Sequence, residues 1–155
     1  MEWRIVDYPV LGVSDPGFTL LGDAEAPAWE HIELVNETRT LRVFVGRGST
    51  GLDAEVELRN PKSMVLIRGG TPVVWDGIHA PYLVETCSLG YGSLLASPAG
   101  DRLALWNDIE LAVLSEGSTR YWRNLVIDDL TVLRFDGSVL HCRGSRHIPG
   151  EFESF

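Results

Sequence analysis

Histidines are the first residues whose chemistry could define a site, because imidazole binds transition metals and transfers protons near neutral pH. The chain has four, His31, His79, His141 and His147, and no two have the close helical spacing of a zincin motif. A metal site is expected only if His79, His147 and Glu151 converge in a barrel, as in a cupin-like, metal-dependent or small-molecule enzyme. That enzyme is one alternative interpretation of the chain.

Nucleophiles are present without the local pattern that activates them. Gly92-Ser93-Leu94 lacks the closing glycine of a nucleophile elbow, and a dyad of Cys87 with His79 would need a geometry that spacing does not indicate. Cys87 and Cys142 lie in apolar segments and are expected to be small core residues, with a disulfide between them left open. We therefore predict no catalytic residue and no cofactor, and favour a protein that is not an enzyme.

One short run is typical of a binding surface. Arg120, Tyr121, Trp122 and Arg123 are consecutive, so on a strand at least one bulky side chain must point outward. Tyr, Trp and Arg are the residue types enriched in binding hot spots. We predict that these four residues contact a partner protein.

The charge balance indicates what kind of partner this is. The formal net charge is −9, which opposes binding to nucleic acid, and Glu55 and Glu57 lie on a strand whose polar face is acidic. An acidic face attracts a basic protein over a long range. The chain is accordingly expected to bind a basic toxin or nuclease as an immunity-type protein; the third alternative is a structural module that forms homo-oligomers through free strand edges.

The elements that must position these residues are strands. Ala54, Val56 and Leu58 alternate with charged residues, and Leu41, Val43 and Val45 do the same one strand earlier, which is the two-residue period of a sheet with one buried face. The Gly-rich stretch 46–51 between these strands predicts that they form a hairpin. The segment 109–113 alternates as well, which predicts antiparallel pairing with one solvated side.

Turn residues predict three further connections. Asp136-Gly137 predicts a two-residue hairpin loop between 131–135 and 138–142, and Pro98 to Asp101 predicts a hairpin between 94–97 and 102–106. The segment 26–36 fits a strand better than a helix, with 36–39 as the loop that leads to Leu41. Asn60-Pro61 ends the acidic strand.

Together these patterns predict a single all-β domain over residues 1–155. We expect an antiparallel β-sandwich or a partly closed barrel of about ten to twelve strands with little or no helix. The five tryptophans lie in five different segments, as expected of a core built from many strands: Trp3, Trp29, Trp75, Trp106 and Trp122, the last in the run predicted to point a bulky side chain outward. No apolar stretch approaches the roughly 18 to 20 residues of a membrane helix, and no secretory signal is visible, so a cytoplasmic protein is expected. The near absence of lysine indicates a bacterial genome rich in G and C.

One partial resemblance is present. Gly92 to Ser97 followed by Gly100 to Asn107 is similar to the last two strands of a WD-repeat propeller blade, and Trp75-Asp76 supplies an earlier Trp-Asp pair. Trp75 and Trp106 are closer together than the roughly 40 to 45 residues of that repeat, and the second pair is Trp-Asn. These departures favour an antiparallel meander that has the pattern of a blade.

Overall fold

The described residues form strands in four sheets. The computed structural model describes residues 1–6, 18–22, 26, 28–60, 62–86, 90–115, 118–123 and 128–145. In strand order, the first sheet contains β1 (Glu2–Ile5), β3 (Ala28–Val35), β4 (Thr40–Arg47) and β2 (Phe18–Leu21). The second contains β5 (Ala54–Arg59), β6 (Lys62–Arg68), β7 (Thr71–Trp75) and β8 (Tyr82–Leu83). The third contains β9 (Ser93–Ala96), β10 (Arg102–Trp106), β11 (Glu110–Ser115) and β12 (Ser118–Arg123), and the fourth β13 (Asp128–Asp136) and β14 (Val139–Ser145).

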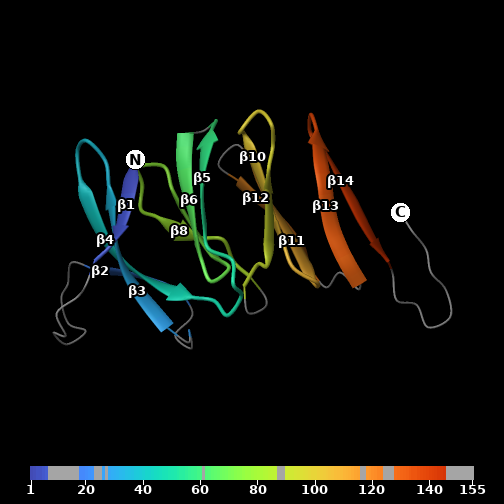
Figure 1. The fold of residues 1–155 in the computed structure, drawn as a ribbon. Helices are drawn as coiled ribbons and strands as arrows, with labels where there is room; N and C mark the ends of the chain where they lie inside the picture. Colours follow the sequence, from blue (N-terminus) through green and yellow to red (C-terminus); the bar gives the residue numbers. More distant parts are fainter. Residues whose placement is uncertain are drawn as a thin grey trace.

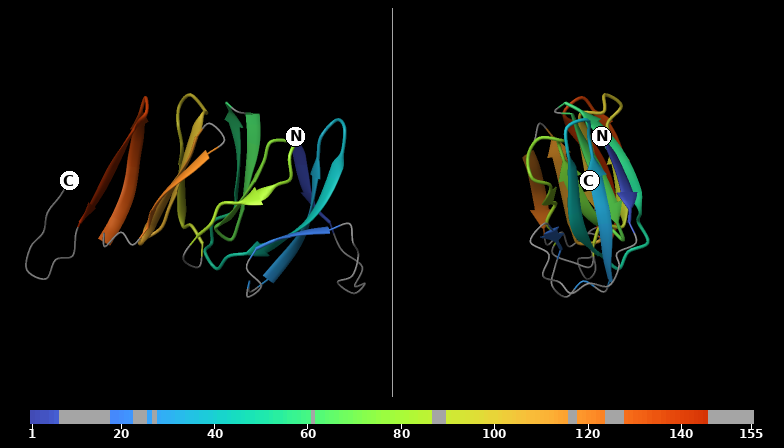
Figure 2. Two further views of the ribbon diagram at one scale, coloured as in Figure 1. Left: turned by 180° about the vertical axis from the view of Figure 1, so that it is seen from behind. Right: turned by 90° about the vertical axis from the view of Figure 1, so that its left-hand side faces the viewer.

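The four sheets are stacked in a row along the sequence (Figure 1), and the same row is visible from behind (Figure 2). The predicted all-β class is confirmed, with layers of open sheets in place of a closed barrel. The described residues include no helix, and hence none long and apolar enough to span a membrane. Fourteen strands are present in them, more than predicted.

In the described part of the chain, a first core lies between the first and second sheets, a second core between the second and third, and a third core between the third and fourth. The inner sheets are therefore buried on both faces. Along β6, Met64 and Leu66 pack toward the first sheet, whereas Val65 and Ile67 pack toward the third. Alternating side chains point to opposite faces of a strand, so a strand between two cores is apolar throughout. This explains the continuous apolar runs in β6, β7, β10 and β11.

The prediction of a solvated side for 109–113 is wrong for the same reason. In β11, Ala112 packs into the second core while Leu111 and Val113 pack into the third, and Glu110 is fully buried. The Glu110 carboxylate accepts hydrogen bonds from the Thr86 hydroxyl and from Asn107 Nδ2, the latter at 3.2 Å. These hydrogen bonds offset the free-energy cost of removing the carboxylate from water.

Most predicted connections are confirmed. β3 and β4 form a hairpin whose loop is closed by Asn36, because Asn36 Oδ1 accepts the backbone N–H groups of Thr38 and Arg39 at 2.9 Å each. β9 pairs with β10 and β13 with β14, all antiparallel. The loop of the last hairpin is Gly137-Ser138, since Asp136 already pairs with Val139.

The predicted hairpin between β4 and β5 is wrong. β4 pairs along its length with β3 and, in parallel, with β2, and β5 pairs with β6 around Asn60. The glycine-rich stretch therefore crosses from the first sheet to the second. The parallel pair of β2 and β4 is also the exception to the predicted antiparallel order.

The segment that resembles a propeller blade is part of a meander, as expected. It forms β9 and β10, which are the first two strands of the third sheet and not its last two. The second and third sheets both follow the chain in order from one edge to the other, which is the connectivity of a four-stranded blade. Of the tryptophans, Trp75 is buried and Trp3 and Trp106 pack against cores, but Trp29 is 37% exposed, contrary to the prediction.

Candidate protein-binding surface

The four predicted contact residues of β12 point to two different sides of the third sheet. Tyr121 lies opposite Ala112 on β11, which packs into the second core, and Trp122 lies opposite Leu111, which packs into the third core. Cross-strand partners share a face. Tyr121 and Arg123 therefore face the second sheet, whereas Arg120 and Trp122 face the side of the fourth, so the run does not form one surface.

Tyr121 and Arg123 meet residues that follow β8 at the rim of the second sheet. The Arg123 guanidinium lies 4.7 Å from the centre of the Tyr121 ring, and Arg123 Nη2 is 3.1 Å from Glu85 Oε2. The backbone N–H of Glu85 donates to the Tyr121 hydroxyl at 3.2 Å. These contacts hold an arginine over an aromatic ring at a place that solvent reaches, since Arg123 is exposed.

Tyr82 extends this surface, because it lies opposite Val74, which packs between the second and third sheets. Partial burial of Tyr82 raises the pKa of its hydroxyl, and the nearby Tyr121 and Asp76 raise it further, so the hydroxyl remains a protonated donor. Tyr82 is 43% exposed. We call Tyr82, Glu85, Tyr121 and Arg123 the rim surface.

Asp76 fixes the loop that carries Ile78. Its Oδ1 accepts the backbone N–H groups of Ile78 and His79 at 2.8 Å each, and its Oδ2 lies 2.5 Å from His79 Nδ1. Burial alone would raise the pKa of Asp76, but these hydrogen bonds outweigh it and lower the pKa to about 2. His79 is thus part of a closed turn.

Two of the three predicted metal ligands, His147 and Glu151, lie outside the described residues. Their convergence with His79 therefore stays a prediction. Within the described residues, no group of three or more His, Cys, Asp or Glu side chains could hold a metal ion. Cys142 is a free thiol that packs against the third core, and burial raises its pKa, which disfavours the reactive thiolate. Cys87 lies outside the described residues.

Glu55 and Glu57 do not join the rim surface. Both lie on β5, at the opposite edge of the second sheet from β8. Glu55 Oε2 accepts a hydrogen bond of 2.7 Å from Trp3 Nε1, which ties it to the first sheet. Glu57 is exposed, so the predicted acidic face and the predicted aromatic surface are two separate places.

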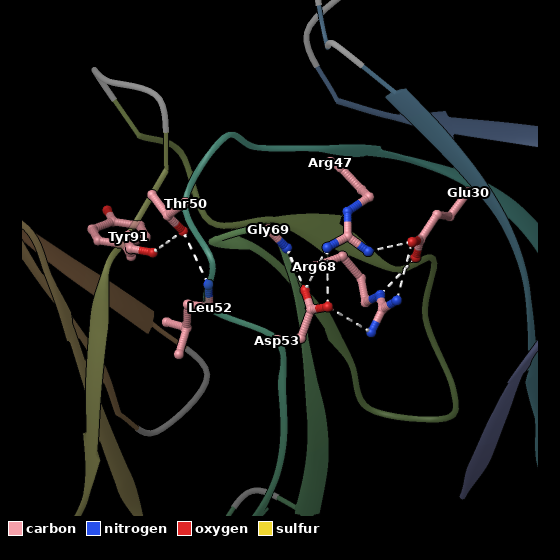
Figure 3. A network of polar contacts seen from close by, with 8 residues as sticks. All are labelled: Glu30, Arg47, Thr50, Leu52, Asp53, Arg68, Gly69 and Tyr91. Carbon is pink, nitrogen blue, oxygen red and sulfur yellow. Dashed lines mark hydrogen bonds and ion pairs between the residues drawn. The ribbon is translucent and has the colours of Figure 1, made fainter.

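A charged cluster that the sequence analysis missed joins the first and second sheets (Figure 3). Arg68 Nε lies 2.6 Å from Glu30 Oε2, Arg47 also binds Glu30, and Arg47 Nη2 lies 3.0 Å from Asp53 Oδ2. The Gly69 backbone N–H donates to Asp53 Oδ1 at 2.6 Å. We call Glu30, Arg47, Asp53 and Arg68 the arginine clamp.

The arginine clamp satisfies its own charges. The hydrogen bonds from Arg68 and Arg47 lower the pKa of Glu30, although partial burial opposes them. The Arg68 guanidinium also lies 5.6 Å from the centre of the Trp3 ring. Since each carboxylate and guanidinium already has a partner, the clamp is a structural joint and not a ligand site. No local spacing could have revealed it, because its members come from β3, β4, β6 and the segment before β5.

Comparisons with family models, with curated proteins and with solved structures find no match for this chain. The class of this protein is therefore described from its fold alone. It is an all-β protein of stacked open sheets. The rim surface is an exposed cluster on it that combines tyrosine rings with an arginine.

Proposed function

We propose that this chain is a non-enzymatic protein-binding domain whose rim surface contacts the partner. The observation that carries the proposal is the Arg123 guanidinium held over the Tyr121 ring, beside the exposed Tyr82. Tyr and Arg dominate binding hot spots because they combine a large apolar area with directed hydrogen bonds. Both are fixed here before binding, which lowers the entropy lost when a partner binds.

A basic protein is the partner that the charge favours. The net charge of −9 attracts a cationic protein, and the exposed Glu85 carboxylate lies within the rim surface. A bacterial immunity-type protein that neutralises a basic toxin or nuclease fits these properties. The acidic net charge is the observation that supports the immunity role.

Site-specific photo-crosslinking tests the proposal with a matched control. A photoreactive phenylalanine analogue is placed at Tyr82 or, on the first sheet, at Trp29, which is similarly exposed. We expect position 82 to capture one basic protein in cells of the source organism and position 29 to capture none. Equal capture at both positions, or an acidic partner, would count against the proposal.

The purified partner then allows a quantitative test. We expect Tyr82→Ala and Arg123→Ala each to weaken binding roughly 10- to 30-fold, as for hot-spot residues, and Trp29→Ala to leave it unchanged. Affinity should fall as salt is raised, because exposed charges are screened. Rescue of growth by this chain when the partner is expressed would establish the immunity role, whereas a partner whose binding ignores both variants would refute the rim surface.

A further inference from the structure

The second sheet ends on one side at β5, and among the described strands β5 pairs with β6 alone. The two strands pair over six consecutive residues of β5 without a bulge. The residues on either side of β5 are described as well, apart from Pro61 in the turn to β6. A regular edge of this kind can accept a further strand.

The backbone groups of Glu55 and Glu57 point outward at this edge. The N–H of Arg59 donates away from β6, to the Gly100 carbonyl in the turn between β9 and β10, at 2.7 Å. Outward-pointing backbone groups alternate along an antiparallel strand, so those of Glu57 and Glu55 point to the same side as that of Arg59. No described residue outside β6 forms a backbone hydrogen bond with either glutamate. The bond from Arg59 to Gly100 therefore starts a ladder that a further strand can continue.

One side of this edge is apolar. Ala54 and Val56 are partly buried and pack against the second core. Leu94 on β9 packs against the same core from the third sheet. Apolar side chains placed beside Ala54 and Val56 would remove more of this surface from water, which is favourable.

The other side of the edge carries negative charge. Glu55 and Glu57 are exposed, and they alternate with Ala54 and Val56 along the strand. Trp3 Nε1 donates to Glu55, but neither carboxylate forms an ion pair with a described residue. Both charges are therefore available to a cation.

The cations nearest to this edge are held elsewhere or lie at its end. The arginines of the arginine clamp are bound to carboxylates within the clamp. Arg59 and Lys62 lie opposite each other at the end of β5, where the turn of the third sheet already bonds to the strand. Glu2 and Arg4 alternate with Trp3 on β1 and so point to the other face of the first sheet. An added strand would therefore meet the two exposed glutamates at its centre.

We infer that the outer edge of β5 binds an extended segment of a partner protein in which Lys or Arg alternates with apolar residues. The segment would extend the second sheet by strand addition, with hydrogen bonds to the backbone of Glu55 and Glu57. Its basic side chains would lie beside these glutamates, and its apolar side chains beside Ala54 and Val56. A second copy of this chain fits less well, because antiparallel pairing of β5 with β5 would place glutamates opposite each other.

This site does not rest on the rim surface, because β5 and β8 are opposite edges of the second sheet. Failure of one therefore leaves the other standing, and Tyr82→Ala is expected to leave binding at β5 unchanged. The inference gives Glu55 and Glu57 a role that is separate from that of the rim surface.

Synthetic peptides of about eight residues, an ordinary strand length, provide the probe. The test peptide alternates Lys with Val, and its charge control alternates Glu with Val. Two further peptides are the test peptide with N-methyl groups on the Lys amides or on the Val amides, because an added strand bonds through every other amide. Fluorescence anisotropy of labelled peptides measures binding to the full chain. We expect the Glu peptide and one of the two methylated peptides to bind at least about tenfold more weakly than the test peptide.

Hydrogen exchange and charge reversal examine the edge itself. In the free chain the amides of Glu55 and Glu57 should exchange fast and that of Val56 slowly, and the test peptide should slow the first two. We expect Glu57→Lys to weaken binding of the test peptide about tenfold and to improve binding of the Glu peptide. Glu37→Lys makes the same change of charge at an exposed turn of the first sheet and should leave both unchanged.

Three results would overturn the inference. Equal binding of the two methylated peptides would exclude strand addition, and equal binding of the Glu peptide would exclude a basic partner. Slow exchange of the Glu55 and Glu57 amides in the free chain, as a monomer or as a dimer, would show that the edge has another occupant.

Discussion

Gly70 lies where three sheets are joined, and its replacement by alanine is expected to be severely destabilising. Its backbone N–H donates to the Leu52 carbonyl and its carbonyl accepts the Tyr91 N–H, both at 2.8 Å. Leu52 belongs to the link between the first and second sheets, and Tyr91 to the link between the second and third. Gly70 has a φ of +83°, and an added Cβ would lie 2.9 Å from the Tyr91 nitrogen and nearer still to the Tyr91 carbonyl and the Thr50 hydroxyl.

Two penalties add in Gly70→Ala. A left-handed alanine costs about 1 kcal/mol. Two of the three clashing atoms belong to the Tyr91 backbone, which cannot turn away as the Thr50 side chain can, and overpacking of this kind costs about 1 to 3 kcal/mol more. We therefore expect a loss of about 3 kcal/mol in the free energy of unfolding.

Two other glycines separate these penalties. Gly137 has a φ of +55° with nothing within 4 Å of an added Cβ, so Gly137→Ala should cost only the conformational term of about 1 kcal/mol. Gly92 also has open space and no positive φ, so Gly92→Ala should be nearly neutral. Urea unfolding followed by circular dichroism measures all three. A Gly70→Ala midpoint no lower than that of Gly137→Ala would refute the assignment of this junction.

Three further predictions concern charge and packing. Glu30→Gln removes the negative charge that both clamp arginines share and should cost about 2 to 3 kcal/mol in urea unfolding, whereas the exposed Glu57→Gln should cost under about 0.5. Equal effects would show that the clamp does not stabilise the fold. Because the pKa of Asp76 is lowered to about 2, its contribution is complete above about pH 4 and is lost as the pH falls toward 2. The stability difference between wild type and Asp76→Asn should thus be about 1 kcal/mol at neutral pH, since His79 is largely exposed, and should vanish at low pH in unfolding curves; a difference that persists there would contradict this. Leu105→Ala opens a cavity at a fully buried position and should cost about 2 to 5 kcal/mol by the same assay, and a loss below about 1 would contradict the second core.

Strand formation was predictable because it depends on local pattern and turn chemistry. The alternation of Ala54, Val56 and Leu58 and the Asp136-Gly137 turn signal each predicted a correct element. The layering was not predictable from the same signals. The alternation in 109–113 predicted a strand with one solvated face, but the third sheet is an inner sheet and buries both faces. Glu110 is buried there because it accepts hydrogen bonds from residues outside its own strand.

Residue types singled out Tyr121 and Arg123, and their role in binding stays a prediction. Their neighbours could not be predicted from the sequence, because Tyr82 on β8 and Glu85 after it come more than thirty residues earlier. Trp122 was grouped with them by adjacency, and the pleat of β12 places it on the other face. The arginine clamp depends on long-range contacts throughout, so no short window of the sequence contains it.

Because the three cores of the described residues each join two consecutive sheets, cooperativity must pass through them one after another, as in a linear array. The last hairpin has a single such neighbour and should open first, without loss of the inner layers. A force applied at the two ends would then meet resistance in steps, one layer at a time.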